Sequence, residues 1–334
     1  MRAYFRYPDG LWPNLLAFGY VLIGYAGGLA LIIGPGWMLN ILGVLLLAHA
    51  QVIAAYFIHE FAHGSVFRQQ AANRLGGECM GWLTGSCYAD FASLRHKHIR
   101  HHADRADIIS FDFRQFLHQR PAALQRLVLV LEWLYIPAVE LLMRVFVIWR
   151  PFLDAQASQG RRRVLTVLTL RTLLLIMLAL VSLKALLLYL LAQVLMITIL
   201  RFMDAYQHTY EVFAAQASDL PAASRPDRNY EQANTYSNLL SERFPLLNLL
   251  VLNFCYHNAH HAQPAQPWHR LAQLHQTLYG EQPRQVLPAR ILLRSFHQYR
   301  LARVFSEDYG VVGQGPGRAD GFQGAVGVSF LTAV

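Results

Sequence analysis

Long uncharged apolar runs constrain this chain more than any other feature. Residues 14–34, NLLAFGYVLIGYAGGLALIIG, carry no charge and are long enough to cross a bilayer as a helix, which takes about 20 residues. Gly34-Pro35-Gly36 predicts a tight turn after this run. Residues 164–203 form a second apolar stretch, long enough for two crossings, with Lys184 near its middle. The sequence therefore predicts an all-α integral membrane fold with four spans in two hairpins, at about 14–34, 37–58, 164–183 and 185–203.

The composition agrees with a membrane protein. Of the 334 residues, 54% are hydrophobic and 15% are charged, whereas soluble domains carry about 25% charged residues. The net charge of +9 comes largely from basic residues that flank the apolar runs, such as Arg161, Arg162 and Arg163 before the second hairpin. This pattern is typical of cytoplasmic loops and argues against a nucleic-acid partner. We therefore expect the open ends of both hairpins, and both termini, on the cytoplasmic side.

The other segments predict one domain and a tail. Residues 124–149 are apolar but interrupted by charges, so we expect a helix lying in the membrane interface there and not a fifth span. Residues 310–334 hold seven of the 22 glycines, which predicts a flexible tail after a single domain over residues 1–309. The three cysteines form no C-x-x-C pair, which argues against a disulfide framework and against a cysteine-based metal site.

Many of the 15 histidines fall into three clusters. Each lies just outside a predicted span or interfacial segment, and the second and third share the spacing H-x-x-H-H. Side chains three and four positions apart lie on one face of a helix, so each cluster presents its imidazoles in one direction. Imidazole suits iron or zinc, and so many rings exceed the needs of one tetrahedral zinc. The sequence therefore predicts two metal ions within a cytoplasmic helical cap, bound by His59 and His63, by His98, His101 and His102, and by His257, His260 and His261.

The first cluster also permits a different interpretation. Residues 59–63, HEFAH, match the H-E-x-x-H pattern of zinc proteases, in which two histidines bind zinc and the glutamate is the general base. An intramembrane zinc metalloprotease built on His59, Glu60 and His63 is therefore an alternative of a different class. It leaves the six histidines of the other two clusters without a role, and the metal content separates the two hypotheses.

The three clusters, set around two apolar hairpins, resemble the histidine boxes of the integral-membrane fatty-acid desaturase and hydroxylase superfamily. The resemblance covers roughly residues 40–280, and NTYSNLLSERFPLLNLLVLNFCYHNAHH resembles the bacterial acyl-lipid desaturase branch. It implies a non-haem centre of two iron ions, with O2 as co-substrate, that removes hydrogen from an unactivated acyl C–H. It further implies an acyl lipid or acyl thioester substrate, a separate electron donor (a ferredoxin or cytochrome b5-like protein with a reductase) and a bacterial inner membrane.

One departure from the family pattern leaves the reaction outcome open. Glu60 stands where aspartate is frequent in the family, and related hydroxylases also carry glutamate there. Hydroxylation of an acyl or alkyl chain on the same two irons is therefore an alternative outcome to desaturation.

Further residues are candidates through their position beside the clusters. Asp204 and His208, four apart in RFMDAYQHTYE, form either a hydrogen-bonded pair at a helix end or part of the site. The resemblance implies that His208 is a ninth metal ligand and that Asp204 orients it or holds a metal-bound water, where some relatives use an amide. Three carboxylates are candidates for orienting a metal-binding imidazole without binding the metal themselves, namely Glu60, Asp104 and Asp107. Glu60 is alternatively a solvated carboxylate, and His96 is considered as a ligand although its spacing fits less well.

Overall fold

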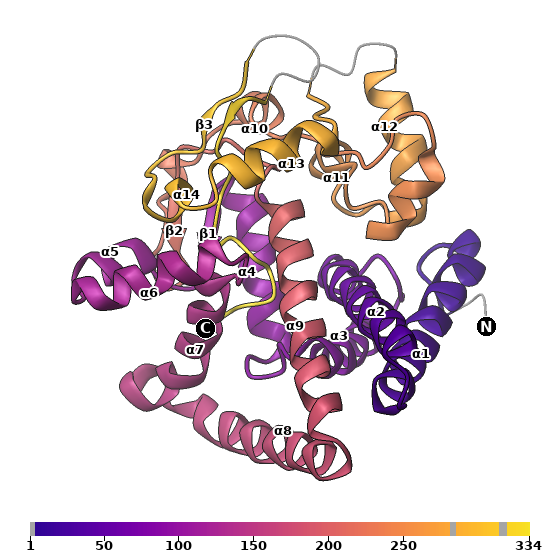
Figure 1. Ribbon diagram of the computed structural model, residues 1–334. Helices are drawn as coiled ribbons and strands as arrows, with labels where there is room; N and C mark the ends of the chain where they lie inside the picture. The colour runs from indigo at the N-terminus through magenta and orange to yellow at the C-terminus, as the bar shows by residue number, and fades with distance from the viewer. Residues whose placement is uncertain (1–3, 281–284, 314–318) are drawn as a thin grey trace.

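Four long apolar helices dominate the molecule, for which the computed structural model describes residues 4–280, 285–313 and 319–334. The helices are α1 (Leu11–Ile33), α2 (Trp37–His63), α8 (Arg161–Val181) and α9 (Leu183–Asp204) (Figure 1). Each is long and apolar enough to cross a membrane, which confirms the predicted membrane fold. Helix α2 continues past residue 58, the predicted end of the second span, and therefore carries the first histidine cluster itself.

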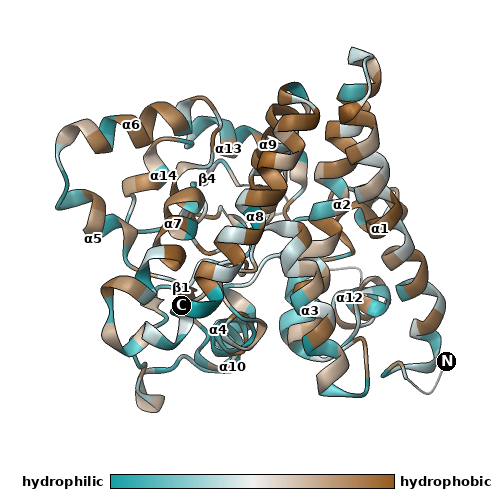
Figure 2. Cartoon of the chain, turned by 90° about the horizontal axis from the view of Figure 1, so that it is seen from below, coloured by the Kyte–Doolittle hydropathy of each residue, from teal (hydrophilic) through white to brown (hydrophobic). Residues whose placement is uncertain are grey.

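The remainder of the chain is mostly helical and is far more polar. Figure 2 shows α9 largely in the hydrophobic colour and α4 largely in the hydrophilic one. The α-helices outside the spans are α3 (Gln70–Thr84), α4 (Phe91–Asp104), α5 (Phe113–His118), α6 (Ala122–Trp133), α7 (Ala138–Leu153), α10 (Arg228–Ala233), α11 (His257–Ala262), α12 (Leu271–Tyr279), α13 (Ala289–Gln298) and α14 (Ala302–Phe305). The 3-10 helices are η1 (Pro8–Gly10), η2 (Ala155–Gly160), η3 (Ala222–Ser224), η4 (Pro245–Val251) and η5 (Trp268–Arg270).

Two short strand pairs join distant parts of this polar region. Strand β1 (Asp107–Ile109) pairs in parallel with β2 (Phe213–Ala215), with Asp107 opposite Phe213. Strand β3 (Gly310–Val311) pairs antiparallel with β4 (Gly321–Phe322). The first pair matters for the site, because it holds the segment that follows α4 beside the segment that follows α9.

Small residues bring α1 and α2 into backbone contact. A Cβ added at Gly28 would lie 2.8 Å from the Cβ of Leu47, and one added at Gly43 would lie 2.8 Å from the Cβ of Leu31. Real Cβ atoms do not approach so closely, so both positions require glycine. Close packing through small residues is a main source of helix association in membranes, where lipid tails are as apolar as the side chains.

Lys184 joins the two hairpins at their closed ends. Its Nζ donates to the backbone oxygen of Gly34, at 2.7 Å, and to Oδ1 of Asn40, at 2.8 Å. The turn between α1 and α2 therefore lies beside the turn between α8 and α9. Both hairpins consequently open toward the same side of the bundle, where the histidines lie.

The region 124–149 differs from the expected single interfacial helix. It consists of α6 and α7, separated at Tyr135, whose φ of 60° is left-handed, and at Pro137. Two of the charges that interrupt this region are internal, because Glu132 and Glu140 lie 2.5 Å and 3.3 Å from Nη1 of Arg201 on α9, whereas Arg126 is exposed. A buried ion pair between helices that are far apart in the sequence cannot be recognised from the sequence of either helix alone.

The predicted flexible tail also differs from the structure. Residues 314–318 lie outside the described residues, but residues 319–334 pack against the rest of the molecule. Phe322 is fully buried, and Val326, Phe330 and Leu331 are 1%, 8% and 3% exposed. The glycine content predicts mobility, but the apolar side chains among and after these glycines bury enough surface to order the segment.

We predict that a methyl group at the contact between α1 and α2 destabilises the bundle. Gly43→Ala places a Cβ within 3.0 Å of three atoms, including the backbone oxygen of Gly28, and overpacking of this kind costs about 1–3 kcal/mol. The measurement is the thermal unfolding midpoint in detergent. Gly19→Ala is the matched control, because a Cβ there meets no atom within 4 Å. Equal midpoints for the two variants would contradict the packing described here.

Candidate metal centre

The first two histidines lie on the last turn of α2. His59 and His63 are four residues apart and therefore project from one face of the helix. The helix ends at Gly64, which has a left-handed φ of 62° and whose N–H bonds to the carbonyls of Glu60 and Phe61. This termination allows the chain to turn away without covering the histidine face.

Helix α4 carries the second cluster toward the first. Its N-terminus is capped by Asp90, whose carboxylate accepts from the backbone N–H of Ser93 at 2.7 Å. The helix packs directly against α2. His98, His101 and His102 follow on its last two turns, before the left-handed Arg105 (φ 51°) ends it.

The third cluster and His208 come from the other side of the site. His257, His260 and His261 lie on the short helix α11, and all three are buried. His208 lies just beyond the end of α9 and forms an isolated β-bridge with Thr235. The structure thus brings together the nine histidines that were predicted from the sequence, including His208.

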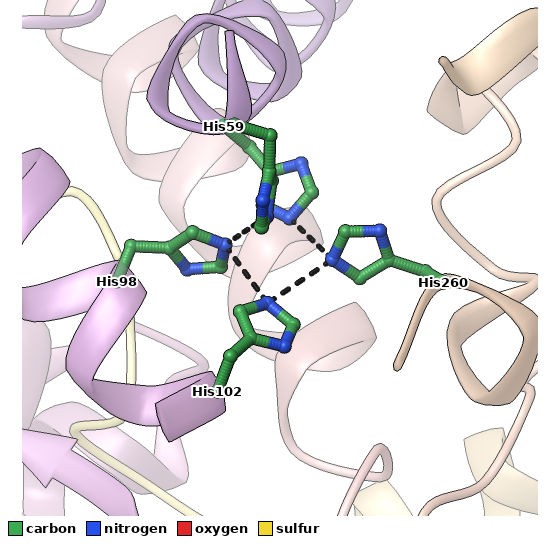
Figure 3. Close-up of side chains that lie close together, drawn as sticks. His59, His98, His102 and His260 are labelled. Carbon is green, nitrogen blue, oxygen red and sulfur yellow. Dashed lines mark hydrogen bonds between the residues drawn. The ribbon is translucent and has the colours of Figure 1, made fainter. Parts of the chain in front are cut away.

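Five of the nine rings form a first group, which consists of His59, His63, His98, His102 and His260. Figure 3 shows the rings of four of them pointing toward one another. The Nε2 atom of His260 lies 3.1 Å from that of His59 and 3.2 Å from that of His102. The Nε2 atom of His98 lies 2.7 Å from that of His63 and 3.2 Å from that of His102.

The other four rings form a second group beside the first, which consists of His101, His208, His257 and His261. The Nε2 atoms of His208 and His257 are 2.8 Å apart, and those of His101 and His261 are 3.3 Å apart. Each group therefore draws its members from elements that are far apart in sequence.

The positions of the protons on two rings of the second group favour a bound cation. The Nδ1 atom of His101 lies 2.8 Å from the carbonyl oxygen of Ala106, and that of His261 lies 2.9 Å from a carboxylate oxygen of Glu231. Both partners are acceptors, so each Nδ1 carries the proton and each Nε2 presents a lone pair. The Nε2 atoms of His101 and His261 therefore face each other without a proton to share. A metal ion between them resolves this repulsion.

The spacing and the charge state of the rings fit metal binding as well. Metal–nitrogen bonds of about 2.1 Å at right angles place two nitrogens about 3.0 Å apart, close to the separations in both groups. Burial lowers the pKa of His101 to about 4 and lowers the pKa of His98, His257 and His261 well below the usual range. Neutral rings keep the lone pairs that a metal requires.

Glu231 orients a histidine and was missed by sequence reasoning. Besides accepting from His261, its carboxylate lies 3.2 Å from Nε of Arg105, the residue that ends α4. Carboxylates in this position fix the tautomer and the direction of a metal-binding imidazole. Glu231 sits in the short helix α10, more than twenty residues from any of the clusters, so its sequence context carries no sign of this role.

The predicted orienting carboxylates occupy different positions. Glu60 accepts from Oγ of Ser65 at 2.6 Å and from the backbone N–H of Trp268 at 3.1 Å, and it lies 3.4 Å from Nδ1 of His59. It is 3% exposed, so it is not a solvated carboxylate.

The two carboxylates that follow the second cluster have separate surroundings. Asp107 lies 3.5 Å from Nδ1 of His101 and accepts from the hydroxyl of Tyr309. Asp104 instead binds Arg100 and Arg225, at 2.9 Å and 3.0 Å. The structure therefore places Asp107, but not Asp104, next to a histidine.

A cavity of about 40 Å³ adjoins both histidine groups. It is lined by His98 of the first group, by members of the second group and by Asp204, whose two carboxylate oxygens lack a hydrogen-bond partner among the described residues. The volume suffices for about one water molecule. His96, the weaker candidate, is exposed on the opposite face of α4 and lines a surface groove.

Comparison with known proteins identifies the family. The model of the family described as Fatty acid desaturase matches residues 35–292, which include all nine histidines. The chain therefore belongs to the fatty acid desaturase family, a family of oxidative membrane enzymes known for non-haem di-iron centres. A search of curated proteins finds no match to the chain.

We predict that the first group loses its metal when His260 is replaced. The purified protein should hold about two irons per chain, and His260→Ala should lose at least one, because this ring faces both His59 and His102. The measurement is elemental analysis after desalting. His96→Ala is the control, since this exposed residue belongs to neither group. Full iron content in His260→Ala would exclude His260 as a ligand.

Replacing Glu231 should weaken the second group without removing a ring. Loss of a carboxylate that orients a ligand typically costs 10–100-fold in metal affinity, and we expect about this loss in Glu231→Ala. Glu231→Gln retains an acceptor oxygen and should lose less. Iron retention against a competing chelator measures the effect, with the exposed Glu242→Ala as the control. If Glu231→Ala holds iron as tightly as Glu242→Ala does, the orienting role is wrong.

Proposed function

We propose that this protein is an O2-dependent fatty-acyl desaturase that works with two non-haem irons. The single observation that carries the proposal is the convergence of nine imidazoles into two adjacent groups, in a chain of the fatty acid desaturase family. Two separate groups suit two metal ions, and neutral imidazole is a ligand that iron accepts readily.

The two groups divide the ligands between the irons. One iron would be held by His59, His63, His98, His102 and His260, and the other by His101, His208, His257 and His261. Asp204 adjoins the four-histidine group through the shared cavity, so we assign it to hold a water beside that iron. Glu231 accepts a hydrogen bond from Nδ1 of His261 and orients that ring, whereas Glu60 lies 3.4 Å from Nδ1 of His59 and makes no hydrogen bond to it.

The reaction requires chemistry that no side chain supplies. An alkyl C–H offers no group for acid–base catalysis, and bound iron supplies the activation of O2 that attacks it. Desaturation converts –CH2–CH2– to –CH=CH–, and O2 takes up the two hydrogens together with two further electrons and two protons to form two waters. The two electrons come from a separate donor protein, a ferredoxin or a cytochrome b5-like protein with its reductase.

The residues around the histidines position the reactants and exclude water. The hydrogen bonds from Nδ1 of His101 and His261 hold both rings with their Nε2 atoms directed inward. The ring of Phe254 packs against His59 and His257, with centroids 4.7 Å and 5.2 Å away, and keeps the space beside them apolar. An acyl lipid or acyl thioester would place its chain on this apolar side.

The histidine ends of the spans face the cytoplasm in this proposal. Basic residues cluster on that side, and Arg68 and Arg74 are exposed there. Such a surface attracts an acidic electron donor over a distance. It also agrees with the preference of cytoplasmic loops for positive charge, in the inner membrane of a bacterium.

The geometry does not favour the zinc protease. In that mechanism Glu60 would face a metal-bound water as a general base. Its Oε2 atom is instead occupied by Ser65 and Trp268, and His59 and His63 share their group with three further histidines. One zinc per chain, in place of two irons, would support the protease.

The lipids of a host that expresses the chain provide the test. We expect new acyl species two mass units lighter than their parents, because desaturation removes two hydrogens. They should be absent with His260→Ala and absent without O2. Species sixteen units heavier would show hydroxylation, the alternative outcome for which the glutamate at position 60 argues. An unchanged lipid profile under O2, with iron bound and an active donor present, would contradict both reactions.

A further inference from the structure

The segment from residue 325 to 334 crosses the histidine site and is held there by α4. Lys97, which is next to His98, is 2% exposed and directs its ammonium group toward this segment. The Nζ atom donates to the backbone oxygens of Ser329, at 2.9 Å, and Thr332, at 2.7 Å. Lys97 therefore clamps the backbone on both sides of Phe330.

Two further contacts fix the segment at its ends. The backbone N–H of Gly327 donates to the carboxylate of Glu140 on α7 at 3.1 Å. The side-chain amide of Gln216 exchanges two hydrogen bonds with the backbone of Val334, at 2.8 Å and 2.9 Å. Figure 1 shows this yellow segment running beside α4 and α9 toward α7.

The clamp sets the ring of Phe330 against the histidines. Its centroid lies 5.9 Å from that of His59 and 6.5 Å from that of His98. It also lies 6.0 Å from Phe254 and 6.3 Å from Tyr56. Phe330 thus contacts rings from α2, from α4 and from the segment that precedes α11.

Phe330 also lines the cavity that adjoins both histidine groups. The apolar part of the lining consists of Ile108, Phe254, Val328 and Phe330. Two of these four residues belong to the clamped segment, which lies beyond residue 292, where the match to the family ends. The apolar wall of the site is therefore completed by residues that the family match does not cover.

We propose that Phe330 is a specificity-determining residue, which sets the position along the acyl chain that is oxidised. The proposal rests on the proposed function. The methylenes of an acyl chain are chemically alike, so only the shape of the space beside the histidines can select one pair of carbons. The clamped ring of Phe330 lies beside His59 and Phe254, so it forms part of the apolar surface next to the histidines that an acyl chain would contact.

The test compares the products of Phe330→Ala and Phe330→Leu with those of the unsubstituted chain. The substrate is one saturated acyl lipid in proteoliposomes with iron-loaded protein, O2 and an electron donor, and mass-spectrometric fragmentation locates the double bond. A change of one methylene in an apolar pocket is worth about 10–200-fold in discrimination. We expect the ratio of positional products to change by about tenfold in Phe330→Ala and by less in Phe330→Leu, with iron content unchanged.

Phe322→Leu is the matched control. Phe322 is a fully buried phenylalanine of the same C-terminal region, but it packs against Tyr206, 5.1 Å away between centroids, and does not line the cavity. It should keep the original product ratio. This control separates an effect on the cavity from a general loosening of the segment.

The outcomes separate this inference from the proposed function. Unchanged product positions in both Phe330 variants, or faster turnover with unchanged positions, would overturn the selecting role and leave the proposed function standing. The absence of any O2-dependent product from the unsubstituted chain would overturn the proposed function and this inference together. A shifted ratio in Phe330→Ala and an unshifted ratio in Phe322→Leu support the inference.

Discussion

The structure depends on the approach of nine neutral imidazoles within a buried volume. Their lone pairs repel one another, and burial removes the water that would otherwise solvate them. The ends of α2, α4 and α9 and the helix α11 are all placed so that this repulsion is concentrated in two small groups. A bound cation converts the repulsion into the strongest local attraction, so metal binding and the folding of this region are coupled.

Sequence patterns predicted the parts of the molecule that follow from local spacing. The four spans could be identified because crossing a bilayer imposes a length and excludes charge. The three clusters could be identified because ligands on one helix face recur at three and four residues. His208 was different, since its spacing to Asp204 is also that of an ordinary hydrogen-bonded pair. The family resemblance, and not the spacing, indicated its place beside His257.

The features that escaped prediction are contacts between residues far apart in the chain. Lys97 lies 232 positions from Ser329, and Glu231 lies 30 positions from His261. The glycines of the last 25 residues suggested mobility because glycine weakens local preference, but they say nothing of distant partners. Likewise, the residues around Glu132 and Glu140 carry no sign that these carboxylates are buried, because Arg201, which neutralises them, lies on another helix.

The hydrogen bond between Lys184 and the turn at Gly34 has a consequence for the depth of the histidine site in the membrane. It places a charge at the closed end of both hairpins, and the Lys184 ammonium also lies 5.5 Å from the ring centroid of Trp37. An aromatic ring and a lysine of this kind anchor the protein at one boundary of the bilayer. From Trp37 to His59 the helix α2 rises by about 33 Å, slightly more than the hydrocarbon thickness of about 30 Å. The histidines therefore lie at the opposite surface of the membrane and not at its centre. If the substrate is the acyl chain that we propose, a chain embedded in the bilayer would have to be drawn partly out of the lipid, toward the headgroups, before its carbons reach the histidines.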